Sequence, residues 1–258
     1  MSPCPPIVLT FAASDPTGGA GLQADVLTLA GMGCHPLSVL TALTVQDTSG
    51  VESMQPVDPE RVRAQAELLL GETRVAAFKL GVLGSAGNVH AVSAILQNHP
   101  DVPVVLDPVL ASGRGDPLAD EAMVQALLDE IVPQSTVVTP NGIEARRLGG
   151  SATLLEAGCE YVLVTGTHEP GDEVVNTLYD RSGVVRQDRW PRLPGSYHGS
   201  GCTLASAVAA ALANGSGVPE AVRDAQEYTW QALAAGFRSG AGQFIPDRFF
   251  WARQNGQG

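Results

Sequence analysis

The chain has 258 residues, 44% of them hydrophobic and 16% charged, which is enough to bury the core of one large α/β domain. No apolar run reaches the ~18 residues that a membrane span needs, and the first apolar run lacks a preceding basic segment, so we expect neither a span nor a signal peptide. The 15 Lys and Arg against 27 Asp and Glu give a net charge of −12, which would repel nucleic acid and anionic membranes.

Apolar runs of strand length alternate with amphipathic stretches of helix length, which predicts a parallel sheet covered by helices. The expected strands are 7–14, 37–45, 76–83, 102–109, 135–141 and 161–166. Their continuous hydrophobicity is typical of strands buried on both faces. Residues 174–190 differ, because two β-rich runs flank "DRSG" and predict a hairpin at a sheet edge.

Helical spacing after the first strand predicts a helix that contains Leu22, Val26 and Leu29. A further helix should begin at Pro59, with Asp58 as its N-cap. Two final helices are expected near 201–214 and 218–238. Because the sequence contains no repeat or linker, it predicts a single domain over 1–258, a three-layer α/β/α sandwich with a mostly parallel central sheet.

Open α/β sheets bind ligands beyond the carboxyl ends of their strands, so the loops that follow strands are the candidate sites. After the first strand, Gly18, Gly19 and Gly21 would let the backbone approach a ligand, and Asp25 follows one turn into the helix. An ordinary glycine-rich turn, with Asp25 favourable to the helix dipole, would look the same. Gln46 ends another strand, where its amide could bind a polar heterocycle or simply be solvated.

Two later strands end in acidic residues. Asp107 emerges from an apolar run, in a position suited to a Mg²⁺ site or to orienting a catalytic group. Asn141 and Glu144 follow the next strand, where they could form a helix cap or hold Mg²⁺ through water.

The segment "HGSGCTLASAVAA" carries the strongest signal for an anion site. Backbone N–H groups of Gly199, Ser200, Gly201 and Cys202 at a helix start would bind an anion, although the segment matches neither the Walker A nor the dinucleotide-binding pattern. The helix dipole should lower the pKa of the Cys202 thiol and make it a proton acceptor or nucleophile, but a small buried residue is equally open. His198 fits a structural donor better than a base.

The four cysteines of the chain lie far apart and form no CxxC pair, which argues against a zinc knuckle and a disulfide framework. A reducing cytoplasm is therefore the expected location.

With these residues in view, the chain resembles the ribokinase-like superfamily, and within it the hydroxymethylpyrimidine/phosphomethylpyrimidine kinases. The resemblance rests on six segments in family order between residues 7 and 213, namely "AASDPTGGAGLQAD", "LTALTVQDTSGV", "KLGVLGS", "VVLDPV", "TPNGIEA" and "HGSGCTLASAVAA". It implies ATP-dependent phosphorylation of 4-amino-5-hydroxymethyl-2-methylpyrimidine and then of its monophosphate, in thiamine diphosphate synthesis. It also implies ATP and Mg²⁺ as cofactors and a homodimer.

The resemblance assigns roles position by position. The pyrimidine pocket would be lined by Ala20, Asp25, Gln46, Val82 and Val109. Mg²⁺ and the phosphates would be served by Asp107, Asn141 and Glu144, and the nucleotide by Thr165. The anion hole would consist of residues 199–202, with Cys202 in the place of the aspartate base of sugar kinases.

The chain departs from the family pattern at two site positions. Val82 stands where many members have methionine, and Thr165 where some have lysine, so we expect Arg114 to supply the missing charge from a loop. Two other functions remain open: a pyridoxal or pyridoxine kinase, which accepts a similar hydroxymethyl-bearing ring, and a silent module that binds the pyrimidine or ATP. Gln46 and the Cys202 segment favour the pyrimidine kinase.

Overall fold

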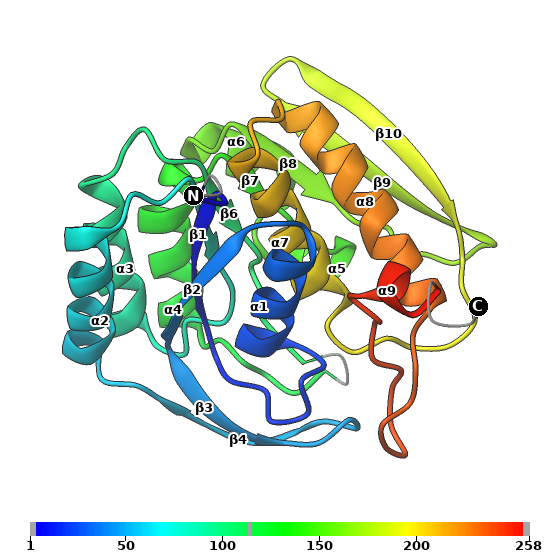
Figure 1. The fold of residues 1–258 in the computed structure, drawn as a ribbon. Helices are drawn as coiled ribbons and strands as arrows, with labels where there is room; N and C mark the ends of the chain where they lie inside the picture. Colours follow the sequence, from blue (N-terminus) through cyan, green and yellow to red (C-terminus); the bar gives the residue numbers. More distant parts are fainter. Residues whose placement is uncertain (1–3, 113–114, 255–258) are drawn as a thin grey trace.

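An eight-stranded sheet forms the middle of the molecule in the computed structural model, which describes residues 4–112 and 115–254 (Figure 1). The strand order is β10-β9-β8-β7-β6-β5-β1-β2. The strands of this sheet are β1 (Ile7–Ala12), β2 (His35–Leu40), β5 (Ala77–Leu80), β6 (Val104–Leu106), β7 (Val137–Val138), β8 (Tyr161–Val164), β9 (Glu173–Asp180) and β10 (Gly183–Pro191). The strands from β2 to β8 pair in parallel, whereas β9 pairs antiparallel with both β8 and β10. The β9–β10 hairpin forms one edge of the sheet, as predicted.

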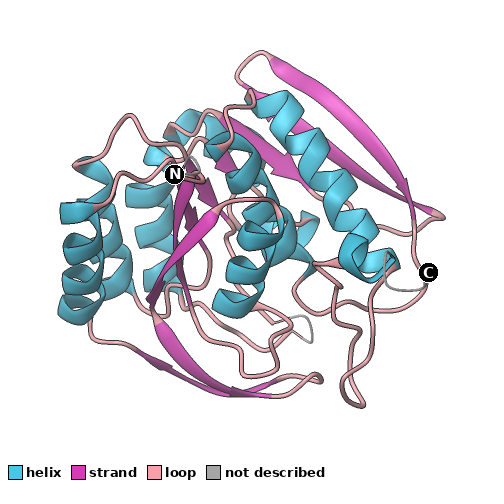
Figure 2. Cartoon of the chain, in the orientation of Figure 1, coloured by secondary structure: helices cyan, strands magenta, loops and turns pink. Residues whose placement is uncertain are grey.

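Helices cover both faces of this sheet, which gives the predicted three layers (Figure 2). One face carries α2 (Pro59–Glu72), α3 (Ala86–Gln97), α4 (Glu121–Ala126) and α6 (Gly150–Ala157). The other face carries α1 (Gly21–Gly31), α7 (Ser200–Ala213) and α8 (Val218–Ala234). Two further α-helices are short, α5 (Gly142–Arg147) and α9 (Phe250–Gln254). A π-helical segment (Leu127–Ile131) and a 3-10 turn (Val132–Gln134) continue directly from α4.

The alternation of side chains along each strand divides the core between the two faces. In β1, Leu9 and Phe11 pack towards α2 and α3, whereas Val8 packs towards α1 and α7. The predicted capping of α2 is confirmed, because the Asp58 carboxylate accepts hydrogen bonds from two backbone N–H groups of the first turn and Pro59 is its first residue.

The prediction of one core strand over 37–45 is wrong. The chain leaves the sheet after β2 at Thr41, and β3 (Ala42–Gln46) pairs with β4 (Val51–Pro56) in a separate two-stranded antiparallel sheet. Leu43 and Val45 are 52% and 56% exposed, so this apolar run is not buried on both faces. Alternation of apolar residues in β3 with half-buried polar ones is the pattern of a strand with one wet face.

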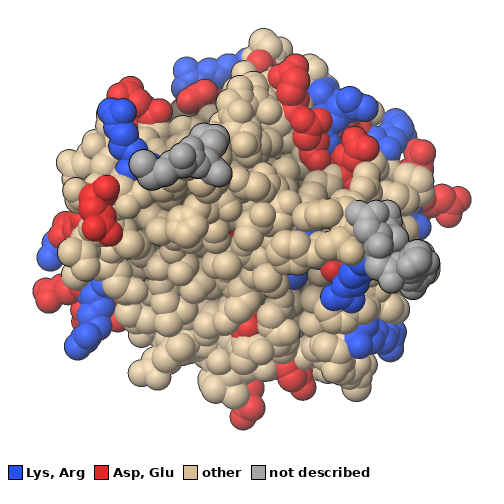
Figure 3. Space-filling model, in the orientation of Figure 1, with Lys and Arg blue, Asp and Glu red and all other residues tan. Residues whose placement is uncertain are grey.

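One face of the molecule, over β2, α1 and the β3–β4 sheet, is largely free of charged side chains, which gather around its rim (Figures 1 and 3). The sequences of β2 and β3 contain no Asp, Glu, Lys or Arg, and Asp25, the charged residue of α1, is buried. Within the described residues, no helix is long and apolar enough to span a membrane.

Candidate functional site

The loops that follow β1, β5, β6, β7 and β8 meet at one end of the sheet, because parallel strands present their carboxyl ends at the same edge. The backbone N–H of Asp107 donates to Leu80 O at 2.8 Å, which joins the ends of β6 and β5. Asn141 bridges to Thr165 across the ends of β7 and β8. The predicted positions after these strands are therefore neighbours in space.

The start of α7 lies at this end of the sheet. Gly199 is the N-cap, with φ of +79°, and the helix begins at Ser200, one residue before the predicted start. Gly199 lies directly on the glycine loop after β1, since a Cβ atom at this position would come within 1.9 Å of the carbonyl oxygen of Gly19. The two glycine segments of the sequence thus form one continuous backbone surface.

The Cys202 thiol lies beside the Asp107 carboxylate, and its interaction with the carboxylate opposes the rise that burial causes in the pKa of Asp107. Gly201 faces the same group, since its Cβ would lie 3.7 Å from Asp107 Oδ1. Burial is the main reason that the pKa of Cys202 rises to about 12; the Lys79 ammonium acts against this rise, and the carboxylates of Asp107 and Asp25 add to it. The predicted lowering of this pKa by the helix dipole is therefore wrong, because burial and nearby negative charges outweigh the dipole.

Two buried carboxyl groups face each other next to this thiol. Burial raises the pKa of Asp107 to about 6, and burial together with the charge of Asp107 raises that of Glu144 to about 7. Glu144 also accepts the backbone N–H of Asn141 at 2.9 Å, which completes a capping box for α5. The prediction that Asn141 and Glu144 form a helix cap is thus confirmed. Glu144 also lies close enough to Asp107 for the charge of Asp107 to disfavour the ionisation of Glu144.

The donor set at these carboxylates fits a hydrated Mg²⁺ ion. Asp107 Oδ2 is buried and has no hydrogen-bond partner in the structure. Leaving such an atom unpaired costs free energy, so a cation or a hydrogen-bond donor is expected to contact it when the site is filled. Across the described residues, no group of three or more His, Cys, Asp or Glu side chains could hold a metal ion by itself. Mg²⁺ in phosphotransferases is commonly bound by only one or two carboxylates together with substrate phosphates and water.

Asp25 is enclosed by β1, β5 and α7 rather than exposed at the end of the sheet, and its contact with the pyrimidine remains a prediction. Its carboxylate is fully buried and accepts hydrogen bonds from Lys79 Nζ at 2.8 and 2.9 Å, Thr10 Oγ1 at 2.7 Å and Ser206 Oγ at 2.8 Å. The reason is register, because Thr10 and Lys79 are paired on β1 and β5 and point to the face that α1 covers. Ser206 lies one helical turn after Cys202, so Asp25 supports the site from below.

Lys79 keeps its charge in this fully buried position. Burial would lower its pKa, but the carboxylates of Asp25 and Asp107 raise it above the ordinary value. The ammonium group also lies directly beneath the site backbone, because a Cβ at Gly81 would come within 2.8 Å of Lys79 Nζ. The site therefore rests on an ionised pair that water does not reach.

Replacing Lys79 by methionine is expected to destabilise the protein by about 3–5 kcal/mol, because it leaves the Asp25 carboxylate buried without its counter-ion. The double variant Lys79→Met/Asp25→Asn removes both charges and should recover most of that loss. Urea unfolding of the wild type, both single variants and the double variant measures the coupling. Strictly additive losses would contradict the interpretation of the two residues as a pair.

Asp15 and His198 connect the two glycine loops. Burial would raise the pKa of Asp15, but hydrogen bonds from the His198 ring, Thr17 and the backbone of Ala20 hold it at about 2. His198 Nε2 lies 2.8 Å from Asp15 Oδ2, and its ring packs so closely on Gly19 that a Cβ there would meet it at 2.4 Å. These contacts favour the structural interpretation of His198.

The remaining predicted residues are half-buried around this end of the sheet. Ala20 is the N-cap of α1, Gln46 ends β3, and Val82 and Val109 follow β5 and β6. The carbonyl of Val82 is fixed by the Thr41 hydroxyl at 2.6 Å, at the point where the chain leaves the main sheet. Arg114, the predicted substitute for a phosphate-binding lysine, lies outside the described residues.

Sequence reasoning missed three charged residues that build the site: Lys79, Asp15 and Arg248. A lysine inside the apolar run "AAFKLGVL" was a readable signal, because such a strand buries its charge only with a partner. Asp15 gave a weaker signal, at the head of a Gly-rich turn. Arg248 gave none, since its partners lie about 45 and 230 positions earlier in the chain.

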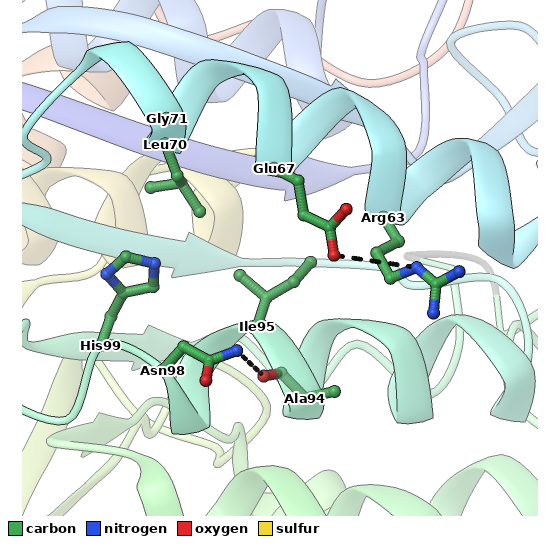
Figure 4. Close-up of a pocket in the computed structure, with 8 residues that line it drawn as sticks. All are labelled: Arg63, Glu67, Leu70, Gly71, Ala94, Ile95, Asn98 and His99. Atoms are coloured by element: carbon green, nitrogen blue, oxygen red, sulfur yellow. Dashed lines mark hydrogen bonds and ion pairs between the residues drawn. The ribbon is translucent and has the colours of Figure 1, made fainter.

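A separate hollow lies between α2 and α3, far from these loops in the fold (Figure 4). Its volume is about 370 Å³, and its lining includes the exposed pair Arg63 and Glu67, 3.8 Å apart, together with His99. It contains none of the predicted site residues. We therefore place the candidate active site at the carboxyl ends of the strands.

Solved structures of a pyridoxal kinase and of a phosphomethylpyrimidine kinase share this fold. The pyridoxal kinase of Staphylococcus aureus in complex with AMP-PCP and pyridoxal matches with a TM-score of 0.84 and 27% identity, over 96% of this chain and 95% of that one. The phosphomethylpyrimidine kinase of Clostridium difficile 630 matches with a TM-score of 0.77 and 29% identity, over 88% of this chain and 99% of that one.

Sequence comparison identifies the family to which this kinase fold belongs. A family model described as phosphomethylpyrimidine kinase matches residues 15–247. The hydroxymethylpyrimidine/phosphomethylpyrimidine kinase of Streptomyces coelicolor is 41% identical over 254 residues, which cover 92% of each protein. The chain belongs to the phosphomethylpyrimidine kinase family, and the predicted resemblance is confirmed.

Proposed function

We propose that this kinase transfers the γ-phosphoryl group of ATP to the primary hydroxyl of 4-amino-5-hydroxymethyl-2-methylpyrimidine, and then to the phosphate of the resulting monophosphate, in thiamine biosynthesis. The observation that carries the proposal is the position of Asp107 beside Gly201 and Cys202 at the start of α7, in a chain 41% identical to a kinase named for both steps. Phosphoryl transfer depends mainly on alignment and on stabilising the charge of the transferred group. The glycine loops and the start of α7 are suited to both tasks.

In the proposed reaction, the hydroxymethyl oxygen attacks Pγ while the bond from Pγ to the bridging oxygen of ADP breaks. The backbone N–H groups of residues 199–202 and the α7 dipole stabilise the charge on the transferred group. The hydroxyl proton passes to the Cys202 sulfur late in the transfer. As the sulfur accepts this proton, the thiol proton of Cys202 moves to the neighbouring Asp107 carboxylate, so that no free thiolate forms beforehand.

The same geometry supports ATP and Mg²⁺ as the cofactors. Glu144 and the unpartnered Oδ2 of Asp107 would hold Mg²⁺ through water, and the ion, when bound, would neutralise phosphate charge. Asn141 and Thr165, at adjoining strand ends, would contact the nucleotide. The half-buried residues Ala20, Gln46, Val82 and Val109 would form the walls around the pyrimidine ring, above the buried Asp25.

A pyridoxal kinase is the second candidate, because the fold matches the Staphylococcus aureus pyridoxal kinase with a TM-score of 0.84. Against it, identity to that protein is 27%, compared with 41% to the Streptomyces coelicolor pyrimidine kinase.

A coupled ADP assay with hydroxymethylpyrimidine, its monophosphate and pyridoxal in parallel separates the candidates. We expect Mg²⁺-dependent ADP formation with both pyrimidines and at least about tenfold lower kcat/KM with pyridoxal, because mismatched polar groups in a buried site are costly. Turnover of pyridoxal alone would establish the second candidate. Tight pyrimidine binding without ADP formation would instead indicate a silent binding module.

We also propose a homodimer and a cytoplasmic location. The face over β2, α1 and the β3–β4 sheet, with few charges and with exposed Leu43 and Val45, is suited to contact a second copy (Figure 3). Light scattering coupled to gel filtration measures the mass, and a monomer at all concentrations would exclude the dimer. The well-separated free cysteines, Cys34 and Cys159 among them buried, are consistent with a reducing compartment.

A further inference from the structure

Arg248 is a buried cation held between the two glycine loops. It precedes α9, is 2% exposed, and donates through Nε to Thr203 Oγ1 at 3.1 Å. Its other two nitrogens donate to the carbonyl oxygens of Gly18, at 3.3 Å, and Gly19, at 2.5 Å. One guanidinium group therefore contacts both the loop after β1 and the first turn of α7.

All three partners of Arg248 are neutral oxygens. Within the described residues, no carboxylate lies within ion-pair distance of its guanidinium, and the adjacent Asp247 pairs with Arg253 at 3.1 Å instead. The other buried cation of the site, Lys79, is neutralised by Asp25. Guanidinium groups do not lose their proton in proteins, so Arg248 is a buried positive charge that has no direct ion pair among the described residues and that Asp25 and Asp15 attract from a greater distance.

The guanidinium of Arg248 lies close enough to the start of α7 to attract a phosphate group bound there. Thr203, which accepts from Arg248, also donates to Gly199 O at 2.8 Å, so the guanidinium lies against the first turn of α7. Charges removed from water interact over several ångströms with little screening. In a protein of net charge −12, such a fixed cation offsets a field that otherwise opposes a polyphosphate.

The same hydrogen bonds fix the backbone geometry. Gly19 O, which Arg248 binds, is the atom on which Gly199 packs so closely that a Cβ would come within 1.9 Å. Without a donor, this carbonyl would be free to turn, and the contact between the loops would loosen. Arg248 therefore acts on the site both by its charge and by the shape it imposes.

We propose that Arg248 is a positioning residue for phosphoryl transfer, which locks loops 16–21 and 199–203 together and places a positive charge without a direct ion pair next to the anion site at the start of α7. The inference rests on the proposed kinase function of that site. It adds a residue that lies just beyond the range 15–247 matched by the family model.

The test compares Arg248→Lys, which keeps the charge but not the planar fork, with Arg248→Gln, which keeps a donor but not the charge. Arg223→Gln, on the exposed face of α8, is the control for a change in net charge alone. We expect Arg248→Lys to retain kcat/KM within about tenfold of wild type and Arg248→Gln to lose about 100-fold, with Arg223→Gln unchanged. Thermal unfolding of each variant is measured in parallel.

A second measurement makes the test independent of turnover. Calorimetric titration with AMP-PCP should show binding to Arg248→Gln weakened at least about tenfold relative to Arg248→Lys. Equal affinity and equal kcat/KM in the two variants would overturn the proposal, and so would losses that follow the melting temperatures alone. A wild-type protein that binds AMP-PCP but forms no ADP would refute the kinase function, while the titration would still decide the role of Arg248.

Discussion

Replacing Cys202 by alanine is expected to lower turnover about 10²- to 10⁴-fold, the usual contribution of a general base, while AMP-PCP still binds. The variant loses the acceptor for the hydroxyl proton but leaves the backbone N–H groups at the start of α7 in place. Its side chain is also smaller than the thiol, so no clash with Asp107 arises. The measurement pairs steady-state ADP formation with calorimetric nucleotide titration.

Cys34→Ala provides a matched control for this change. Cys34 is buried and lies at the far end of α7, where its thiol is within 3.8 Å of Ala210 O. This variant should cost some stability but little turnover, since it leaves the site untouched. Near-normal turnover of purified Cys202→Ala would refute the assignment of Cys202 as the base and leave it a packing residue.

The second large effect is expected from Gly199→Ala, which should reduce turnover about 100-fold or more, because misplacing reacting groups by an ångström has that consequence. The Cβ atom would come within 1.9 Å of Gly19 O, and neither backbone can move without opening the contact between the loops. The φ of +79° adds about 1–2 kcal/mol of strain for a non-glycine residue. Steady-state kinetics and urea unfolding measure the two effects separately.

Gly215→Ala is the control that separates the backbone strain of Gly199→Ala from its steric clash with Gly19. Gly215 follows the other end of α7 with φ of +92°, and a Cβ there would meet nothing within 4 Å. The free energy of unfolding of Gly215→Ala should therefore fall by a similar amount, about 1–2 kcal/mol, while its turnover stays unchanged. If Gly199→Ala turned over as fast as Gly215→Ala, the close approach of the two glycine loops would have no part in catalysis.

The layers of the fold could be predicted because hydrophobic periodicity reports burial directly. The runs that became β5 and β6 are buried along their whole length, and Asp58 caps α2 as its spacing from Pro59 implied. The prediction of one core strand over 37–45 was wrong, because apolar residues also occupy exposed positions of the β3–β4 sheet, such as Leu43 and Val45. A single sequence does not distinguish an apolar side chain in a core from one left open.

For the candidate site too, some features could be predicted from the sequence and others could not. The positions of Asp107 and Glu144 followed from their places after strands, since those ends converge in any parallel sheet. The state of Cys202 did not follow, because its pKa depends on Asp107, Asp25 and Lys79, which come from other segments. The burial of Asp25 was equally hidden, since it depends on the register of two strands and on a residue of α7.

The contact of Arg248 with Gly18 and Gly19 also constrains how the protein comes into being. These groups are separated by 230 and 229 positions, so this contact closes nearly the whole chain into a loop. Contacts of such long range form late in folding, because the entropy of closing the loop must be overcome first. During synthesis, the sheet and its helices can assemble while the carboxyl-terminal segment is still in the ribosome, and Asp15 and His198 can already bring the glycine loops together. The hydrogen bonds from Arg248 form only after residue 248 emerges, so a chain that stops short of it should fold its layers but hold the two loops less firmly.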